Sequence, residues 1–323
     1  MALKVAVIGA GRRGRAHTVA VGDCEDLGQV VGIADIDQER AATLAGAEAP
    51  YATPFTDAAA MVEQTAPDVV VITSPPPLHH EHVALALAHG AHIILEKPIT
   101  LNVAEAEEIG EAADRAGRMV HVCHQLRYGP GIDELRALLS NQAVALTHIW
   151  NYRKGPDIPG NWSRSWGGGH VVEWGIHYID LCRYLMNTEA VSVYARYADQ
   201  VLRGQPTWDN WDSYSLTIQW ANGAVGSYAS TYALKPGIDS SAGLEIVAAD
   251  GKAALAWNEA VWTTPAGRDA YSAAPNTLQR TFLQAVISGD PSGIRQTFDD
   301  ALKTHRLVIA ANESALSGEV VNL

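Results

Sequence analysis

The sequence LKVAVIGAGRRG at residues 3–14 decides the fold of the N-terminal half of this chain. Its apolar run predicts a buried strand, and the G-x-G-x-x-G pattern that follows predicts a tight turn into a helix. Gly9 permits the turn, Gly11 lets a pyrophosphate approach the backbone, and Gly14 allows the helix to pack closely on the strand. Free N–H groups and the helix dipole would hold the anion. The stretch therefore predicts a dinucleotide-binding unit, with a glycine-rich turn that binds no ligand as the alternative.

A second apolar run, at residues 29–34, ends in Asp35, which lies 21 residues after the last glycine of this fingerprint. A carboxylate at this place accepts hydrogen bonds from the adenosine ribose hydroxyls and repels a 2′-phosphate, so NAD is favoured over NADP. Arg12, Arg13 and Arg40 keep NADP open, because any of them could reach a 2′-phosphate. We expect Asp35, Arg12 and Arg13 to contact the cofactor.

Helix-like and strand-like segments alternate through the rest of the first half. Helices are expected at 57–65, 82–88 and 103–116, and strands at 68–73, 91–95 and 119–123. Strands that alternate with helices build a parallel, doubly wound sheet. We therefore place an α/β Rossmann domain at residues 1–124.

The strand expected at 91–95 ends in the tripeptide Glu96-Lys97-Pro98. Because Pro98 has no backbone donor and cannot continue the ladder, Lys97 lies where the strand stops. That point is the ligand-facing edge of a parallel sheet, so Glu96 and Lys97 are candidate cofactor contacts. Two interpretations of Lys97 remain: a solvated loop residue, or an ammonium group that projects into a ligand crevice.

A turn with three successive prolines, which begins Ser74-Pro75, reaches the same edge of the predicted sheet. We expect Ser74, Pro75 and His79 to lie near the cofactor. The cluster His-His-Glu-His at 79–82 also suggests zinc, but its spacing matches neither H-E-x-x-H nor H-x-x-E-H. Adjacent histidines at a helix start point in different directions, so no metal site is predicted.

The pattern changes after residue 128. Strand-like segments are expected at 143–152, 191–197, 213–220, 225–232 and 244–249, with helices at 132–139, 277–287 and 297–316. Consecutive strands predict an α+β domain with a largely antiparallel open sheet, which we place at 125–323. One face of such a sheet must be covered by helices or by another subunit. We therefore expect a homo-oligomer, a dimer or tetramer, that forms through this sheet.

The segment GGGHVVEWGIHYIDLCRYL at 167–185 interrupts the strands. A helix over this segment would place Glu173, His177 and Asp180 on one face, since they are spaced by four and three residues. Histidine titrates near neutral pH, and a neighbouring carboxylate fixes its tautomer, so the stripe suits acid–base chemistry. A surface stripe with ordinary ion pairs is the alternative.

The polar loop at 151–166 precedes that segment and carries Tyr152, Arg153, Trp162 and Trp166. Aromatic faces beside hydrogen-bonding side chains suit a polyhydroxylated ligand, although a single tryptophan is more often simply packed. These four residues and Asp180 are the candidate substrate contacts.

The formal charge of −13 at pH 7 disfavours nucleic acid and anionic membranes, because their binders neutralise phosphates with Lys and Arg. The three cysteines lie far apart with no C-x-x-C pair, which suits free thiols in a reducing compartment. The first glycine-rich turn leaves no room for a signal peptide, and no apolar run approaches the roughly 20 residues of a membrane span. We expect a soluble, cytoplasmic protein.

The fingerprint, the Glu96-Lys97-Pro98 tripeptide and the triple-glycine helix with Glu173 and His177 together resemble the Gfo/Idh/MocA family. This is the group of glucose-fructose oxidoreductase and inositol dehydrogenase. The resemblance implies a Rossmann domain, a C-terminal domain on an open, largely antiparallel sheet, and NAD or NADP at their seam. It also implies that Lys97 is an active-site lysine and that His177 and the acidic residue four positions earlier face the nicotinamide. This chain departs from the family at position 173, where Glu replaces the usual Asp.

These features lead to the hypothesis of an NAD(P)-dependent dehydrogenase acting on a secondary alcohol of a sugar, cyclitol or related polyol. His177 would take the hydroxyl proton, Lys97 would stabilise the developing alkoxide, and Glu173 would orient His177. Two alternatives remain. One is a redox-neutral lyase or glycoside-cleaving enzyme of the same fold, and the other is a non-catalytic NAD-binding sensor.

Overall fold

The computed structural model describes residues 2–155, 163–203, 209–256, 259–272 and 277–323. The chain divides into two compact units, which are described separately. The first joins Met1–Cys123 with Thr277–Leu302, and the second joins His124–Asn276 with Lys303–Leu323. The first division lies next to the expected boundary between 1–124 and 125–323. Residues 277–302, which were expected in the C-terminal domain, pack with the N-terminal unit. Each unit therefore consists of two separate stretches of the sequence.

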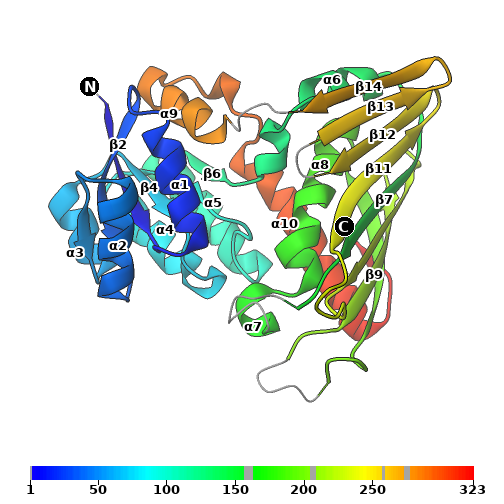
Figure 1. The fold of residues 1–323 in the computed structure, drawn as a ribbon, viewed down its shortest axis with the longest axis horizontal. Coiled ribbons are helices and arrows are strands. Elements are labelled where there is room, and N and C mark those ends of the chain that lie inside the picture. Colours follow the sequence, from blue (N-terminus) through cyan, green and yellow to red (C-terminus); the bar gives the residue numbers. More distant parts are fainter. Residues whose placement is uncertain (1, 156–162, 204–208, 257–258, 273–276) are drawn as a thin grey trace. The chain divides into compact units, whose positions relative to one another are not determined.

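The N-terminal unit is built on a six-stranded parallel sheet with strand order β3-β2-β1-β4-β5-β6 (Figure 1). Its strands are β1 Leu3–Ile8, β2 Gly28–Ala34, β3 Thr53–Phe55, β4 Val69–Ile72, β5 His92–Leu95 and β6 Val120–Val122. Every residue of β4 is buried, as expected for a strand covered on both faces. The strand order reverses between β1 and β4, and ligands of doubly wound sheets bind outside the carboxyl ends of the strands at such a point.

The helices of this unit are α1 Arg12–Gly22, α2 Gln38–Glu48, α3 Ala58–Thr65, α4 His79–Ala88, α5 Val103–Ala116 and α9 Leu278–Ser288, with short turns η1 Pro76–Leu78 and η4 Pro291–Gly293. Side chains of Asp37, Asp57 and Asn102 accept a backbone N–H and so fix the starts of α2, α3 and α5. Helix α4 begins three residues earlier than predicted, because η1 leads directly into it. The short strand β3 was not predicted.

The C-terminal unit is built on a nine-stranded sheet with order β14-β13-β12-β11-β7-β10-β9-β8-β15 (Figure 1). Its strands are β7 Val144–Tyr152, β8 Ala190–Ala198, β9 Ser213–Trp220, β10 Val225–Thr231, β11 Ser241–Ala248, β12 Gly251–Ala256, β13 Glu259–Thr264, β14 Gly267–Ser272 and β15 Val321–Asn322. Among the described strands, β7 and β10 form the one parallel pair, and the other neighbours are antiparallel. The prediction of a largely antiparallel sheet is confirmed, although β12 to β15 were not foreseen.

The helical elements of this unit are η2 Gln125–Tyr128, α6 Ile132–Leu139, α7 Arg164–Gly167, the π-helical turn η3 Val171–Gly175, α8 Ile176–Met186 and the later part of α10 Phe298–Ser317. Helices α6 and α8 lie on one face of the sheet (Figure 1). Buried side chains such as Ile179 and Trp220 belong to the core of this unit. Residues 167–185 were predicted to form one α-helix, but the structure divides them between the end of α7, a π-helical turn and α8. Glu173 lies in the π-helical turn, so its relation to His177 is not the regular α-helical i,i+4 relation.

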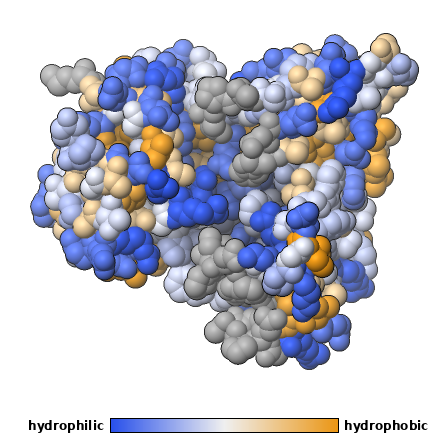
Figure 2. All heavy atoms as spheres, in the orientation of Figure 1, coloured by the Kyte–Doolittle hydropathy of each residue, from blue (hydrophilic) through white to orange (hydrophobic). Residues whose placement is uncertain are grey.

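The other face of this sheet exposes apolar side chains at positions that alternate with buried ones. They include Leu146, Tyr194, Val225 and Val247. Figure 2 shows hydrophilic side chains over most of the visible surface of each unit, with smaller hydrophobic patches between them. Within the described ranges, none of the helices has both the length and the apolar character needed to cross a membrane.

Candidate active site

The three fingerprint glycines have the conformations and spaces that their predicted roles require. Gly9 has a φ of +98°, which favours glycine, and a side chain at Gly14 would collide with the carbonyl oxygen of Gly9. In contrast, a Cβ added at Gly11 would meet nothing within 4 Å. There is thus no space for a side chain at Gly14, where the strand and helix pack, whereas the backbone at Gly11 is accessible to a pyrophosphate. These residues fit a bound dinucleotide.

Asp35 lies at the end of β2 beside this turn. Its Oδ2 accepts the N–H of Ala10 at 2.8 Å, and its Oδ1 accepts the N–H of Asp37 at 3.0 Å. Arg40 lies 3.5 Å from Oδ1, so this arginine is paired with the carboxylate instead of being held for a 2′-phosphate. Arg12 is exposed. The fixed carboxylate supports NAD as the cofactor.

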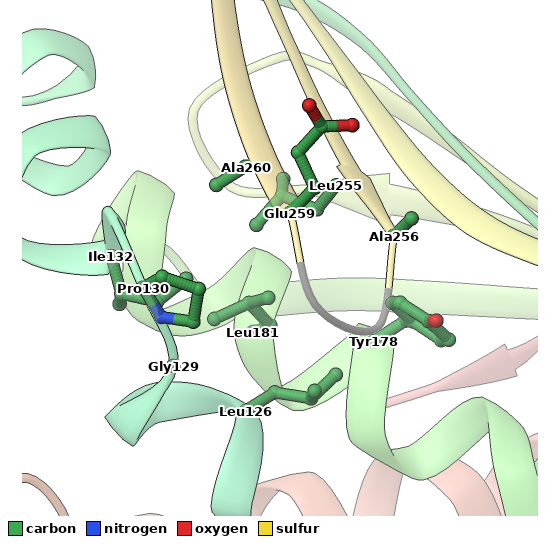
Figure 3. Close-up of a pocket in the computed structure, with 10 residues that line it drawn as sticks. All are labelled: Leu126, Gly129, Pro130, Ile132, Tyr178, Leu181, Leu255, Ala256, Glu259 and Ala260. Carbon is green, nitrogen blue, oxygen red and sulfur yellow. The ribbon is translucent and has the colours of Figure 1, made fainter. Parts of the chain in front are cut away.

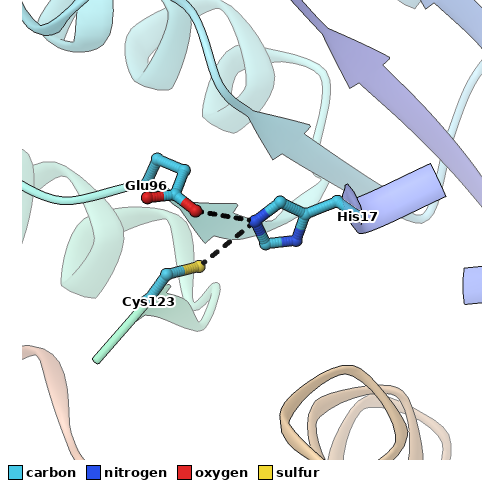
Figure 4. Close-up of side chains that lie close together, drawn as sticks. All are labelled: His17, Glu96 and Cys123. Atoms are coloured by element: carbon cyan, nitrogen blue, oxygen red, sulfur yellow. Dashed lines mark hydrogen bonds and ion pairs between the residues drawn. The ribbon is translucent and has the colours of Figure 1, made fainter. Parts of the chain in front are cut away.

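A buried cluster connects α1 to the residue before Lys97. The Glu96 carboxylate Oε1 lies 2.9 Å from His17 Nε2 and accepts a hydrogen bond of 2.6 Å from Arg13 Nε, while Arg13 Nη2 completes an ion pair (Figure 4). Burial alone would raise the pKa of Glu96, but the His17 hydrogen bond and the charges of Arg13 and Lys97 hold it well below its usual range. Glu96 is therefore an anion in the folded protein.

His17, Glu96 and Cys123 also have the donor types of a metal site, and their donor atoms lie within 4.8 Å of one another (Figure 4). The 2.9 Å between His17 Nε2 and Glu96 Oε1 is a hydrogen-bond distance. Two ligands at about 2.0–2.1 Å from one tetrahedral zinc would be roughly 3.3 Å apart. Arg13 holds the same carboxylate oxygen, and burial raises the pKa of the Cys123 thiol well above its usual value. The residues fit a hydrogen-bonded cluster and not a metal centre.

Lys97 is partly exposed at the carboxyl end of β5, and its peptide bond to Pro98 is cis. The turn after it is held from α4, because His79 Nδ1 lies 2.9 Å from the Pro98 carbonyl oxygen and 3.1 Å from that of Ile99. The other ring nitrogen lies 2.8 Å from the Ser74 carbonyl oxygen. His79 is completely buried, and its expected place near the cofactor remains a prediction. Its ring joins two turns at this edge of the sheet.

Ser74 and Pro75 lie at the same edge, on the turn that leads into η1. The Ser74 hydroxyl lies 2.8 Å from His82 Nδ1, and Pro75 is exposed. Their contact with a cofactor remains a prediction.

In the C-terminal unit, Glu173 is held by a tyrosine that follows β10. Tyr232 donates its hydroxyl to Glu173 Oε2 at 2.8 Å, and the ring of His170 stacks on Tyr232 with centroids 3.9 Å apart. Burial lowers the pKa of His170 to about 4, so this ring is neutral at pH 7. Its Nε2 then donates to the Trp211 carbonyl at 2.7 Å, and its Nδ1 accepts from the Ser230 hydroxyl at 2.7 Å. The Glu173 carboxylate is thus positioned by a buried, uncharged support.

His177 lies in the first turn of α8 and is buried. Its ring meets the ring of Trp174 edge-on, with centroids 6.3 Å apart and an interplanar angle of 62°. The guanidinium of Arg153 lies 3.5 Å from the centroid of Trp174, and its Nε donates to Asn151 Oδ1 at 2.9 Å. Arg153, which follows β7, therefore packs on the π-helical turn before His177 and is held in place by stacking. Among the other predicted substrate contacts, Tyr152 and Trp166 are exposed, and Trp162 lies outside the described residues.

Asp180 is placed differently from the prediction. Its carboxylate receives two hydrogen bonds of 2.7 Å from Arg127 and one of 2.9 Å from the Thr304 hydroxyl. The side chain is 1% exposed. Burial alone would raise the pKa of Asp180, but the charge of Arg127, aided by His124, holds it well below its usual range. A substrate hydroxyl would have to displace these partners, so the structure argues for a structural role and against substrate binding by Asp180.

A small recess opens elsewhere in the C-terminal unit (Figure 3). It is lined by Leu126, Gly129, Pro130, Ile132, Tyr178, Leu181, Leu255, Ala256, Glu259 and Ala260. This lining is mostly apolar and includes none of the predicted site residues, so it does not suit a polyhydroxylated ligand.

Strand order, fingerprint geometry and the fixed Asp35 carboxylate define the class of this protein as one with an NAD-binding Rossmann domain. Residues 3–124 match the model described as "Oxidoreductase family, NAD-binding Rossmann fold", and residues 142–254 match the GFO/IDH/MocA C-terminal domain. The chain belongs to the Gfo/Idh/MocA family, which confirms the resemblance in its sequence.

Two relatives and one solved structure illustrate the similarity. The chain is 28% identical to D-glucoside 3-dehydrogenase of Escherichia coli (strain K12) over 251 residues, which are 72% of this chain and 71% of that protein. It is 29% identical to inositol 2-dehydrogenase 3 of Saccharopolyspora erythraea over 211 residues, 64% of this chain and only 59% of that protein. Levoglucosan dehydrogenase in complex with NADH has the same fold, with a TM-score of 0.84 at 20% identity over 100% of this chain and 99% of that chain.

Sequence reasoning missed several supporting residues. Tyr232 lies 59 positions after Glu173, and Arg127 lies 53 positions before Asp180. Gln279, whose amide nitrogen lies 2.9 Å from His17 Nδ1, is 262 positions away from that histidine. No local pattern marks such pairs, because they meet only through the packing of separate elements.

Proposed function

We propose that this chain is an NAD-dependent dehydrogenase that oxidises a secondary alcohol of a sugar, cyclitol or related polyol. The observation that carries the proposal is the buried His177 on α8, directly after the π-helical turn that presents the Glu173–Tyr232 pair. The partly exposed Lys97 at the carboxyl end of β5 supports it. The relatives named as D-glucoside and inositol dehydrogenases support the substrate class, because glucosides and inositols carry such alcohols.

Each group has a distinct role in the proposed reaction. His177 accepts the hydroxyl proton, because imidazole titrates near neutral pH. Lys97 donates a hydrogen bond to the same oxygen and stabilises its developing negative charge. Glu173, fixed by the Tyr232 hydroxyl, orients His177 or binds a neighbouring hydroxyl. Bound NAD supplies the acceptor for the hydride that leaves the substrate carbon.

Side chains near this constellation would select the substrate. Arg153 presents a guanidinium held by Trp174 and Asn151. Such a fork of donors suits adjacent hydroxyls. Tyr152, Trp162 and Trp166 would add aromatic faces for the sugar ring.

The test is a panel of sugars and cyclitols, supplied with NAD and followed by absorbance of NADH. The proposal expects NADH to accumulate with at least one member, and His177→Ala and Lys97→Ala to lower kcat strongly while calorimetry shows NAD affinity little changed. Substrate conversion without NADH would indicate the redox-neutral reaction instead. Tight NAD binding with no conversion of any member would indicate the sensor.

We also infer that the outer face of the C-terminal sheet joins copies of this chain into a dimer or tetramer. The exposed apolar positions on that face support it, because apolar patches of this kind commonly mark interfaces. Light scattering after size exclusion should show an oligomer that Val225→Glu weakens, whereas Gln64→Glu, which adds the same charge to the exposed surface of α3, should leave it unchanged. A monomeric wild-type protein would contradict this inference.

A further inference from the structure

Arg13 stands at the last variable position of the fingerprint, in the first turn of α1, and its side chain is one-third exposed. Its guanidinium contacts another side chain of the same unit. It holds the Glu96 carboxylate, and the next residue along the chain is Lys97. The fingerprint turn and the lysine turn are therefore linked by one ion pair within the N-terminal unit.

The hydrogen bonds around this pair fix where the protons lie. The Gln279 amide nitrogen donates to His17 Nδ1 at 2.9 Å, so this nitrogen acts as an acceptor. In a neutral imidazole the other nitrogen, Nε2, then carries the proton and donates it to Glu96 at 2.9 Å. Glu96 is thus held from α1 by two side chains, the cationic Arg13 and the ring of His17.

Other titratable groups surround the carboxylate. Arg13 and His17 face it from α1, Lys97 follows it in the chain, and Cys123 after β6 and His79 of α4 are within electrostatic range. Burial keeps the Cys123 thiol neutral. Arg13 is thus a cation that balances Glu96 from outside the lysine turn, and Lys97 interacts electrostatically with the same carboxylate.

We propose that Arg13 is a positioning residue for Lys97: by balancing the Glu96 charge, it sets how strongly this turn favours a charged ammonium group. The proposal rests on the role of Lys97 in the proposed dehydrogenase. It predicts opposite effects from the two halves of the ion pair. Removing Arg13 leaves the Glu96 anion uncompensated and stabilises the ammonium, whereas removing the Glu96 charge leaves Arg13 unbalanced and destabilises it.

The test measures the pKa of Lys97 in the protein without cofactor or substrate, by NMR titration of ¹³C-methylated lysines, with Lys97→Arg used to assign the signal. We expect Arg13→Met to raise this pKa and Glu96→Gln to lower it, each by about 0.5–1 unit for one nearby, partly screened charge. The double variant should return towards the wild-type value. Arg12→Met is the matched control, because it removes the same charge from the adjacent fingerprint position.

The basic limb of the pH profile of kcat should move in the same directions when a substrate is known. Equal shifts in Arg13→Met and Arg12→Met, or shifts of the same sign in Arg13→Met and Glu96→Gln, would overturn the proposal. Thermal unfolding of each variant separates these effects from loss of the fold. Because the titration needs no turnover, it remains decisive if the proposed dehydrogenase activity fails.

Discussion

The buried pair of Asp180 and Arg127 gives a prediction that separates a structural role from a role in substrate binding. Both side chains are nearly inaccessible, at 1% and 2% exposure, and two hydrogen bonds of 2.7 Å join them. Asp180→Asn keeps the shape of the side chain but leaves the Arg127 guanidinium without its counter-charge. Breaking a buried pair in this way costs about 3–5 kcal/mol of unfolding free energy. Since whole proteins are stable by only about 5–15 kcal/mol, the loss should be plain in urea unfolding followed by tryptophan fluorescence.

Two further variants refine this measurement. Thr304→Val removes one hydrogen bond to the carboxylate and should cost about 1.5–3 kcal/mol. Replacing both Asp180 and Arg127 by leucine should cost less than Asp180→Asn, because no charge is left buried alone.

The contribution of Asp180 to the free energy of unfolding should depend on pH. The folded pKa of Asp180 is depressed, so its stabilising contribution is present above the unfolded carboxyl pKa, near 4, and is lost as the pH falls below that value. Asp180→Asn should therefore unfold with a weaker dependence on acid than the wild type. Unchanged urea unfolding together with a raised KM would refute the reasoning and return Asp180 to the substrate site.

Three other outcomes are expected. Gly11→Ala should weaken NAD binding in calorimetry with little change in thermal unfolding, whereas Gly14→Ala should impair both, because its Cβ meets the carbonyl of the first fingerprint glycine. His170 binds a proton more readily when unfolded, so stability should fall by about 3 kcal/mol as the pH drops from about 6.5 to 4, and His170→Asn should remove that dependence in urea unfolding. Tyr232→Phe removes the donor to Glu173, worth about 1.5 kcal/mol, and should lower kcat roughly tenfold in steady-state kinetics without changing NAD affinity.

The predictable parts of the fold depend on local patterns. Helices α5 and α6 have the predicted boundaries, because apolar periodicity and a capping side chain such as Asn102 specify them within a few residues. Strands β12 to β14 were missed. Their alternation is weak, and β14 is largely exposed, so little apolar pattern marks it. The π-helical turn was also missed, since its sequence has the spacing of an ordinary helix.

The candidate site shows the same limit. Glu173 and Asp180 are both acids on one predicted helical stripe, yet one is supported by Tyr232 and the other is neutralised by Arg127. The difference arises from which neighbouring element each carboxylate meets, and a spacing of seven residues contains no information about those neighbours.

The sequence by itself determined that this chain has an NAD-binding Rossmann domain and belongs to an oxidoreductase family, because a glycine-rich turn between a strand and a helix is a local solution to holding a pyrophosphate. The tertiary structure alone decided which polar residues are held by buried partners. It made Glu96 the centre of a charged cluster and Asp180 part of the core, and it made His79 a link between two turns. The physical reason is that desolvation and partner charges act through space, between residues that the chain order keeps far apart.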